Sequence, residues 1–185
     1  FFCRSAPPDV KPWFPLFRKA ASNTFVIRTC QLRPESRGFV ELGSDDPMAP
    51  AKIQNNFLQT ETDRRVLRDC VKMTRDIVSQ SAFEGLRDAE LVPGESVKTD
   101  DEIDAFVRQN LSTVFHPLGT CKMGSDPMAV VDDQLRVHGI AGLRVADASI
   151  MPTLTSGNTN APSIMIGEKC AAMVLSSAVA SKAAA

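Results

Sequence analysis

The chain has 185 residues and a mass of 20.1 kDa, enough for one domain or two small ones with a buried core. Lys and Arg number 21 against 22 Asp and Glu, so the net charge of −1 provides no cationic field and argues against a nucleic-acid partner. No run of 18 or more apolar residues is present to span a bilayer. We expect a folded cytoplasmic protein, with association to a membrane surface left open.

The cysteines and histidines also restrict the protein class. The five cysteines are widely spaced and contain no Cys-x-x-Cys pair, which favours a reducing compartment over a disulfide-stabilised secreted protein. With only two histidines, the sequence supplies no ligand set at zinc-site spacing, so we expect no metal. The chain opens Phe-Phe-Cys-Arg, without an initiating Met or a signal peptide, and we expect it to be a piece of a longer protein.

In the first third of the chain, the sequence predicts loops and short strands. Prolines and aromatic residues mark residues 1–23 as a loop segment that must rest on other surface. Residues 24–31 are rich in β-branched side chains, and we expect them to form a hairpin with a second strand at 38–42, across the turn at 34–38. A third strand is predicted over 53–58.

Two helices are predicted in the middle of the chain. Over residues 60–79, apolar side chains recur at spacings of three and four with charged residues between them, which is typical of an amphipathic helix. Thr99 and Glu102 have the spacing of a capping box, which predicts a second helix ending near Asn110. The apolar residues expected to face the core from this second helix are Ile103, Phe106 and Val107.

In the last third of the chain, the sequence predicts a strand, a loop and an apolar helix. Residues 142–147 indicate a strand that ends at Asp147, a position where α/β proteins often bind ligands. An apolar helix is predicted over 163–175, with Pro162 at its start. Residues 176–185 are low in complexity and are predicted to be disordered.

Candidate chemistry is concentrated between residues 115 and 170. The sequence contains no Gly-x-Ser-x-Gly elbow and no Gly-x-Gly, so it encodes neither a serine hydrolase nor a self-contained nucleotide site. Taken alone, each candidate has a structural alternative: His116 could be a structural histidine, Asp147 an Asx turn and Asn160 a helix N-cap. A function can therefore be inferred only from these segments taken together.

Together these segments closely resemble the C-terminal signature of the glucose-methanol-choline (GMC) family of flavin-dependent alcohol oxidoreductases. The resemblance covers roughly residues 24–175, and within the family the pattern is most similar to the choline dehydrogenase-like branch, in which the second active-site position is Asn. The matching residues are Pro34-Glu-Ser-Arg-Gly-Phe-Val-Glu-Leu42, Asp46-Pro47, His116-Pro-Leu-Gly-Thr120, Met123-Gly124, Val131-Asp132, Arg136-Val-His-Gly139, Gly142-Leu-Arg-Val145, Asp147-Ala-Ser-Ile-Met-Pro152 and Gly157-Asn-Thr-Asn-Ala-Pro162.

The resemblance implies an α+β fold, an antiparallel sheet flanked by helices. Residues 24–141 would form the substrate-binding module, and residues 142–175 would return a strand and a helix to the FAD-binding domain. The Rossmann Gly-x-Gly-x-x-Gly of the FAD-binding half is missing from this chain. We therefore expect the chain to be inactive without that N-terminal half.

The resemblance also implies the reaction and its residues. The enzyme would oxidise a primary alcohol to an aldehyde by transferring a hydride to N5 of FAD, with His116 as the base and Asn158 holding the substrate oxygen. Free imidazole titrates near neutral pH and so can accept a hydroxyl proton, and an amide donor can stabilise the developing alkoxide. The backbone at the start of the last helix would stabilise the reduced flavin. The positions expected to contact the cofactor are Asp147, Ala148, Thr159 and Asn160.

The expected partners follow from the same reaction. They are a small alcohol substrate, an electron acceptor that is oxygen or a quinone, and the missing FAD-binding half. The competing hypothesis is a non-catalytic binding module that keeps the fold without FAD. Against it, the sequence retains both polar active-site candidates, His116 and Asn158, which a purely structural domain does not need.

Overall fold

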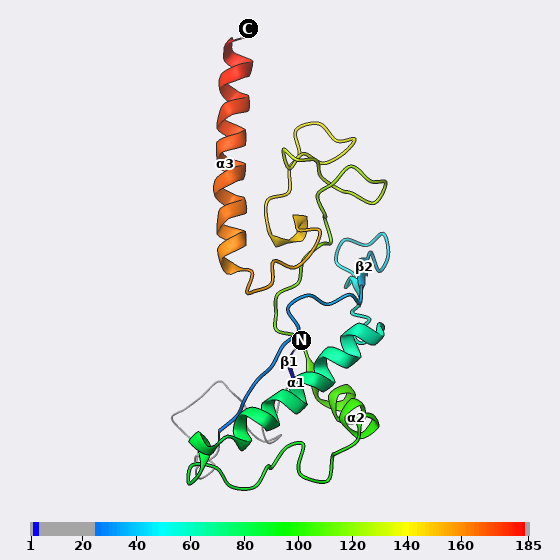
Figure 1. Ribbon diagram of the computed structural model, residues 1–185. Coiled ribbons are helices and arrows are strands. Elements are labelled where there is room, and N and C mark those ends of the chain that lie inside the picture. The colour runs from blue at the N-terminus through cyan, green and yellow to red at the C-terminus, as the bar shows by residue number, and fades with distance from the viewer. Residues whose placement is uncertain (1, 4–24, 184–185) are drawn as a thin grey trace, which may run out of the picture. The chain divides into compact units, whose positions relative to one another are not determined.

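The computed structural model describes residues 2–3 and 25–183, and the described helices and strands are drawn in Figure 1. The predicted loop over 1–23 lies outside the described residues, apart from residues 2–3. The described chain forms two compact units, which we call unit 1 (up to residue 36, and 56–114) and unit 2 (37–55 and 115–183). In chain order the elements are β1 (Phe2–Cys3), β2 (Phe39–Glu41), β3 (Lys52–Gln54), α1 (Glu61–Ser79), the 3-10 turn η2 (Ser81–Phe83), α2 (Asp100–Asn110), β4 (Leu111–Ser112), the 3-10 turn η3 (Ala148–Ile150) and α3 (Asn160–Ala183).

Two small antiparallel sheets accompany the helices. β1 pairs with β4, and β2 pairs with β3. Helices beside small antiparallel sheets agree with the α+β class expected from the sequence. The extent of regular sheet is smaller than expected, because much of unit 2 is held by isolated bridges between loops.

Unit 1 contains the two helices that the sequence predicts. The Thr60 side chain caps α1 by accepting a hydrogen bond from the Asp63 N–H at 3.2 Å. The predicted capping box of α2 is confirmed: Thr99 Oγ1 accepts from the Glu102 N–H at 3.3 Å, and Glu102 Oε2 accepts from the Thr99 N–H at 2.8 Å. The apolar faces of both helices form one core with Leu58. The buried residues of that core are Leu58, Leu67, Val71, Ile103 and Val107.

A buried carboxylate joins the segment before β2 to α1. Asp63 is fully buried, and its oxygens accept hydrogen bonds from Gln31 Nε2 at 2.7 Å, Glu35 N–H at 2.9 Å and Ser36 N–H at 2.8 Å. Burial raises the pKa of Asp63, but the hydrogen bonds from Ser36, Glu35 and Gln31 outweigh it, so that pKa lies below its ordinary value. The charged side chain is therefore a structural clamp.

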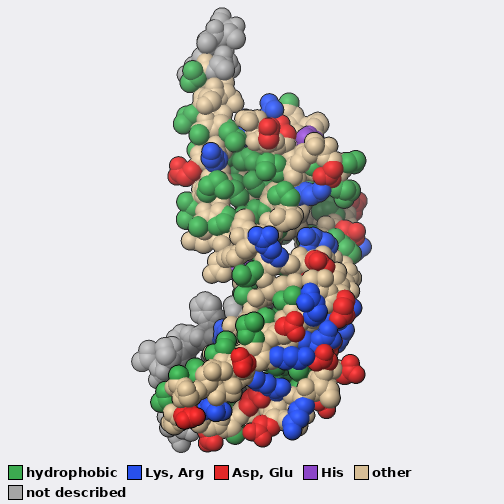
Figure 2. All heavy atoms as spheres, viewed as in Figure 1, with side chains coloured by type: hydrophobic (Ala, Val, Ile, Leu, Met, Phe, Trp, Pro, Cys, Tyr) green, Lys and Arg blue, Asp and Glu red, His purple; other side chains and the backbone are tan. Residues whose placement is uncertain are grey.

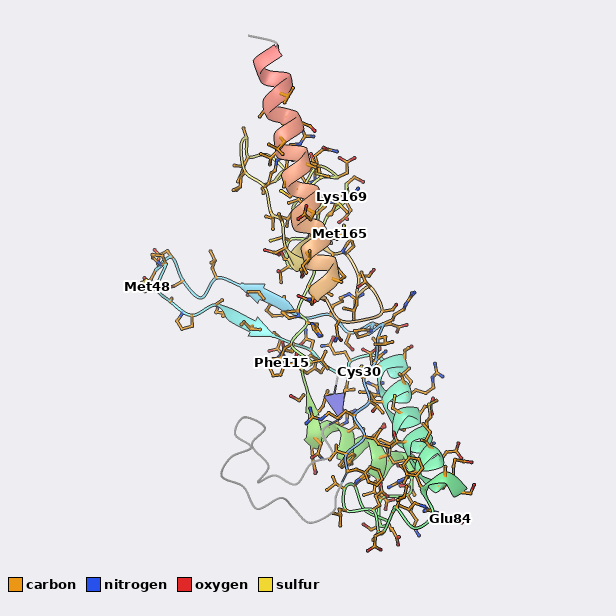
Figure 3. The ribbon with its side chains drawn as sticks, turned by 90° about the vertical axis from the view of Figure 1, so that its left-hand side faces the viewer. Cys30, Met48, Glu84, Phe115, Met165 and Lys169 are labelled. Atoms are coloured by element: carbon orange, nitrogen blue, oxygen red, sulfur yellow. The ribbon has the colours of Figure 1, made fainter. Side chains whose placement is uncertain are left out.

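The predicted hairpin between residues 24–31 and 38–42 is wrong. β2 pairs instead with β3, in the register Phe39↔Gln54, Val40↔Ile53, Glu41↔Lys52. The turn between them is closed at Asp46, whose side chain accepts from the Met48 N–H at 2.9 Å, and Met48 lies at its tip (Figure 3). Residues 25–31 form no strand, and within this segment only Thr29 takes part in a β-bridge. Gln31, at the end of the segment, donates a hydrogen bond to the buried Asp63 instead of pairing with β2.

The core of unit 2 is built mostly from loops. Three isolated bridges connect them: Met123 with Val131, Val131 with Val137, and Arg136 with Arg144. The buried residues of this core are Val131, Leu135, Ile150, Met151 and Ile166. The predicted strand over 142–147 is wrong, since only Arg144 forms a bridge there. Frequent reversals explain this, because positive φ angles at Leu135 (62°), Gly139 (77°) and Gly142 (76°) divide the chain into runs too short for a ladder.

Helix α3 is longer than predicted. It begins at Asn160 and continues to Ala183, so the prediction of disorder over 176–185 is wrong for residues 176–183. The segment after Gly167 has no Gly or Pro and is rich in Ala, the strongest helix former, which allows the helix to continue. Ser177 Oγ also donates to the Met173 carbonyl at 2.8 Å within the helix.

The surface of α3 is apolar on several sides. Figure 2 shows hydrophobic side chains along this helix. The exposed large apolar residues of α3 are Ile164, Met165, Val174, Leu175 and Val179. In the part of the chain that the structure describes, no helix is both long enough and apolar enough to cross a membrane.

Candidate active site

The predicted site begins at His116, which follows a strained residue. Phe115 is 80% exposed and has a φ of 60°, in the left-handed region that non-glycine residues rarely adopt. Ser156, two residues before Asn158, has a φ of 63°. Such conformations are concentrated at functional sites. Three other non-glycine residues of the described chain share this conformation away from the predicted site, so the angles at Phe115 and Ser156 do not by themselves mark an active site.

The loop after His116 is hydrogen-bonded to the backbone of η3. The Cys121 N–H donates to the Ser149 carbonyl at 3.0 Å, and the Met123 N–H donates to the Ile150 carbonyl at 2.7 Å. At Gly119, which has a φ of 85°, an added Cβ would lie 3.4 Å from the Met151 carbonyl oxygen. These contacts hold residues 116–124 against the segment that contains Asp147 and Ala148.

A direct contact joins His116 to the start of α3. His116 Nδ1 lies 2.9 Å from Thr159 Oγ1, and the Thr159 backbone N–H donates to the same ring nitrogen at 3.4 Å. Thr159 is only 8% exposed and precedes the first helical residue. Its carbonyl accepts from the Ser163 N–H at 3.0 Å and from Ser163 Oγ at 2.7 Å, so Thr159 is tightly held. The imidazole, which is half-buried, leaves Nε2 as the ring nitrogen that does not contact Thr159.

Two exposed amides lie on either side of Thr159 in the sequence. The side chains of Asn158 and Asn160 are exposed, and neither forms a hydrogen bond with any other described residue. At Gly157, nothing lies within 4 Å of where a Cβ would be. The chain around the start of α3 therefore presents both amide groups at the surface.

Asp147 and Ala148 have structural contacts of their own. Asp147 caps η3 by accepting from the Ser149 N–H at 2.7 Å. Hydrogen bonding from the Ser149 side chain and backbone holds the pKa of Asp147 below its ordinary value. Ala148 packs against the buried core of unit 2. The cofactor contacts expected of both residues stay predictions.

The structure brings some of the predicted site residues together. His116 contacts Thr159, and its loop is bonded to the segment after Asp147. From the sequence we expected only backbone contacts between Thr159 and a cofactor, and not the contact of its side chain with the imidazole. No sequence signal could have found that contact, because 43 positions separate the two residues. The Thr159 backbone N–H, which we expected to donate to a flavin, donates to His116 Nδ1 instead.

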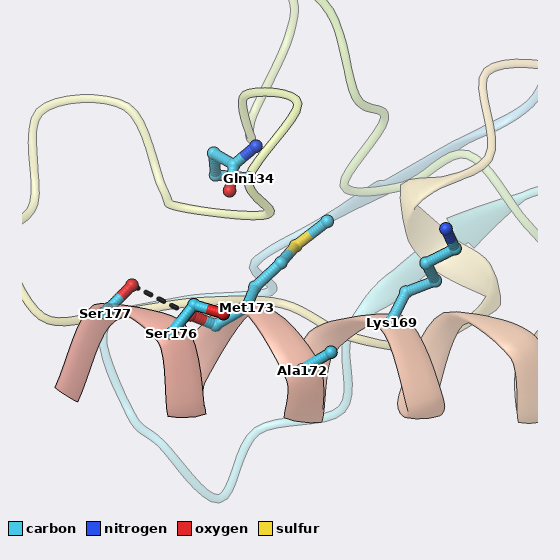
Figure 4. A pocket seen from close by; sticks show the side chains of 6 residues that line it. All are labelled: Gln134, Lys169, Ala172, Met173, Ser176 and Ser177. Atoms are coloured by element: carbon cyan, nitrogen blue, oxygen red, sulfur yellow. Dashed lines mark hydrogen bonds between the residues drawn. The ribbon is translucent and has the colours of Figure 1, made fainter. Parts of the chain in front are cut away.

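An open cleft of about 500 Å³ lies elsewhere in unit 2, beside α3. Figure 4 shows Gln134 on a loop opposite Met173 of the helix, and no predicted site residue lines the cleft. Its lining residues are Gln134, Lys169, Ala172, Met173, Ser176 and Ser177. Among the described residues, no group of three or more His, Cys, Asp or Glu side chains is arranged to hold a metal ion.

Comparison with known proteins identifies the family. A family model described as GMC oxidoreductase, built on its C-terminal domain, matches residues 34–167. The chain belongs to the GMC oxidoreductase family. An oxygen-dependent choline dehydrogenase from Sinorhizobium fredii is 49% identical over 187 aligned positions, which cover 94% of this chain and 34% of that protein. The resemblance to the choline dehydrogenase-like branch of the GMC family is thus confirmed. The chain spans about a third of the length of this relative.

Solved structures of GMC oxidoreductases support the same fold. Pyridoxine 4-oxidase from Mesorbium loti superposes with a TM-score of 0.72 at 38% identity, over 76% of this chain and 27% of that structure. An FAD-dependent oxidoreductase from Chaetomium thermophilum superposes with a TM-score of 0.73 at 30% identity, over 77% of this chain and 25% of that structure. These similarities confirm the predicted fold class.

Proposed function

We propose that this chain is the C-terminal part of an FAD-dependent GMC oxidoreductase that oxidises a primary alcohol to an aldehyde, with His116 as the base. The observation that carries the proposal is the held imidazole: Thr159 contacts Nδ1, and Nε2 is the nitrogen left for a substrate. The similarity to a choline dehydrogenase supports an alcohol as the substrate class.

The residues at the start of α3 fit the pyrimidine side of a flavin. The backbone N–H groups of Asn160 and Ala161 have no partner within the helix, and the positive end of the helix dipole favours negative charge there. Negative charge near N1 and the C2 carbonyl of a reduced flavin would be stabilised by these donors and by the Asn160 amide. By resemblance to the family, Asp147 and Ala148 would contact the ribityl and pyrophosphate part. When bound, FAD supplies the hydride acceptor.

The chain's own residues would orient the alcohol and remove its proton. The proton passes from the hydroxyl oxygen to the imidazole of His116. The exposed Asn158 amide donates a hydrogen bond to the same oxygen, a contact that strengthens as negative charge develops. Asn158 positions the substrate and takes no proton.

The remaining partners of the proposed enzyme are an electron acceptor, oxygen or a quinone, and an N-terminal nucleotide-binding half. The apolar surface of α3 supports the second partner, since Ile164, Leu175 and Val179 are 60%, 67% and 70% exposed. A cluster of large apolar side chains exposed on one helix commonly marks a surface that another part of the protein covers. We propose that the rest of the flavoenzyme covers α3.

Flavin reduction in the full-length protein that carries this chain tests the function. We expect a yellow protein that bleaches when choline or another primary alcohol is added without oxygen. His116→Ala should keep the flavin and slow its reduction by about 10²- to 10⁴-fold, the usual contribution of a general base. The matched control is His138→Ala, because His138 is exposed and, among the described residues, its Nε2 contacts the Gly124 carbonyl at 3.0 Å and no predicted site residue.

Three outcomes would contradict parts of the proposal. Unchanged flavin reduction in His116→Ala would exclude it as the base. A full-length protein that binds flavin but reacts with no alcohol would exclude the proposed substrate class. A protein without flavin would favour the non-catalytic binding module.

A further inference from the structure

Gly157 differs from most other glycines of the chain, because no contact or backbone angle within the chain requires it. Gly139 and Gly142, for example, have φ angles of 77° and 76°, which favour glycine over other residues. At Gly38, an added Cβ would clash with the carbonyl oxygen of Gln54, across the β2–β3 hairpin. Gly157 has neither feature, since its φ lies outside the left-handed region and nothing lies within 4 Å of where a Cβ would be.

Among the described residues, Gly167 is the other glycine with an ordinary φ and open space at its Cβ position. It lies on the exposed surface of α3, which we propose the rest of the flavoenzyme covers. Gly157, by contrast, is half-buried and directly precedes Asn158. Glycine leaves the backbone free at a cost in stability, and one of its uses is to let the backbone approach a ligand closely. A bound molecule would give Gly157 that use.

The open space at Gly157 lies beside the predicted site. Gly157 is two residues from Thr159, so their Cα atoms are at most about 7 Å apart. Thr159 Oγ1 lies 2.9 Å from His116 Nδ1, and the Thr159 carbonyl accepts from the Ser163 N–H at 3.0 Å. These contacts hold the end of segment 157–159 at the imidazole and at the first turn of α3.

The order of residues along the chain favours the substrate over the flavin as the neighbour of Gly157. In the proposed function, the backbone at Asn160 and Ala161 faces the flavin, and the Asn158 amide faces the substrate oxygen. Gly157 follows Asn158 in the direction away from the helix. Its open space therefore extends the site on the substrate side.

We propose that Gly157 is a specificity-determining residue, which leaves room for the carbon chain of the alcohol next to its hydroxyl group. This inference rests on the proposed function, because it takes the substrate to be an alcohol held at Asn158. A side chain at position 157 would occupy the space beside the bound alcohol. Since one methyl group changes the fit of a substrate markedly, even alanine would reject the larger alcohols.

Gly157→Ala in the full-length flavoenzyme tests the inference, because it adds one methyl group at an unstrained position. The substrates are primary alcohols of different size, namely 1-propanol, 2-methyl-1-propanol, choline and benzyl alcohol. Among the alcohols that the parent protein oxidises, we expect kcat/KM of the larger ones to fall at least about tenfold more than kcat/KM of the smallest. Ala141→Val is the control, since Ala141 is exposed in a turn of the same unit, and it should leave the order of preference unchanged.

Flavin content and thermal stability provide readouts besides activity. Because the backbone angle and the space at position 157 accept a Cβ, Gly157→Ala should bind as much flavin as the parent protein, measured by visible absorbance. Its thermal midpoint without substrate should stay within about 3 °C of the parent value.

Three results would overturn the inference. Equal losses of kcat/KM for small and large alcohols would show that Gly157 does not select by size. A lower thermal midpoint would show that the glycine serves the fold, and lost flavin would assign the space to the cofactor. If the parent protein oxidises no alcohol, the proposed function fails and the inference with it. A parent protein that oxidises alcohols with the same preferences as Gly157→Ala contradicts the inference alone.

Discussion

The two units differ in how their structure is encoded. Unit 1 is built on two regular helices, and Figure 2 shows Lys and Arg interspersed with Asp and Glu over their surface. Unit 2 has a core of the same size, five buried apolar residues in each, but gathers it mainly from loops joined by isolated bridges. The predicted site residues all lie in unit 2.

The structure of unit 1 depends mainly on interactions between residues close in sequence, whereas that of unit 2 depends on interactions between residues far apart in sequence. The helices of unit 1 are capped by Thr60 and Thr99, whose side chains each accept a hydrogen bond from a backbone N–H three residues further along the chain. In unit 2, by contrast, the loop that follows His116 depends on carbonyls at Ser149 and Ile150, far along the chain. Loop segments held by distant partners are a common way to position functional groups on a fixed frame.

Removing core volume from each unit tests whether the loop-built core is packed as tightly as the helical one. Leu67 in unit 1 is 1% exposed and Ile166 in unit 2 is 5% exposed. We expect Leu67→Ala and Ile166→Ala each to lower the free energy of unfolding by about 3 kcal/mol, measured by urea denaturation. Ile53→Ala, at a site 67% exposed, is the control and should change it by less than about 0.5 kcal/mol. A much smaller loss at Ile166 would mean that unit 2 is loosely packed.

Asp63 is the long-range contact of unit 1, and removing its charge should cost less. In Asp63→Asn one carboxylate oxygen becomes an amide donor, which faces the Ser36 N–H if it replaces Oδ2, or the donors of Gln31 and Glu35 if it replaces Oδ1. We expect the free energy of unfolding to fall by about 2 kcal/mol. An unchanged urea midpoint would show that the clamp contributes nothing.

The same clamp predicts an acid dependence of stability. Because the folded pKa of Asp63 is lowered, its contribution is complete above the ordinary Asp pKa of about 3.9 and is lost as the pH falls through the folded value. The unfolding free energy of Asp63→Asn should therefore vary less with pH in this acid range. Equal pH dependence in both proteins would contradict the assignment.

The smallest expected effect is at a helix cap. Thr99→Ala removes the side-chain acceptor for the Glu102 N–H and should destabilise unit 1 by about 1 kcal/mol. The exposed Lys98 is adjacent, so Lys98→Ala is the matched control, and its thermal midpoint should stay near that of the parent protein. Equal thermal midpoints for Thr99→Ala and the parent protein would show that this helix cap does not contribute measurably to the stability of unit 1.

The sequence by itself determined the features that depend on neighbours along the chain. These are α1, α2 with its capping box, the start of α3 near Pro162, and the family, which the motifs around His116 and Asn158 carry. Periodicity and caps act over three or four residues, so they can be read directly from the sequence.

Only the tertiary structure decided the partner of β2, the bridges in place of a strand at 142–147, and the contact between His116 and Thr159. Each depends on groups far apart in sequence whose hydrogen bonds form only once the chain has folded. Residues 25–31 show the reason: their β-branched side chains favour a strand, but the buried Asp63 binds Gln31 and the backbone at Glu35 and Ser36, and thereby fixes the segment that follows them. A buried carboxylate needs those donors, and that need outweighs local strand propensity.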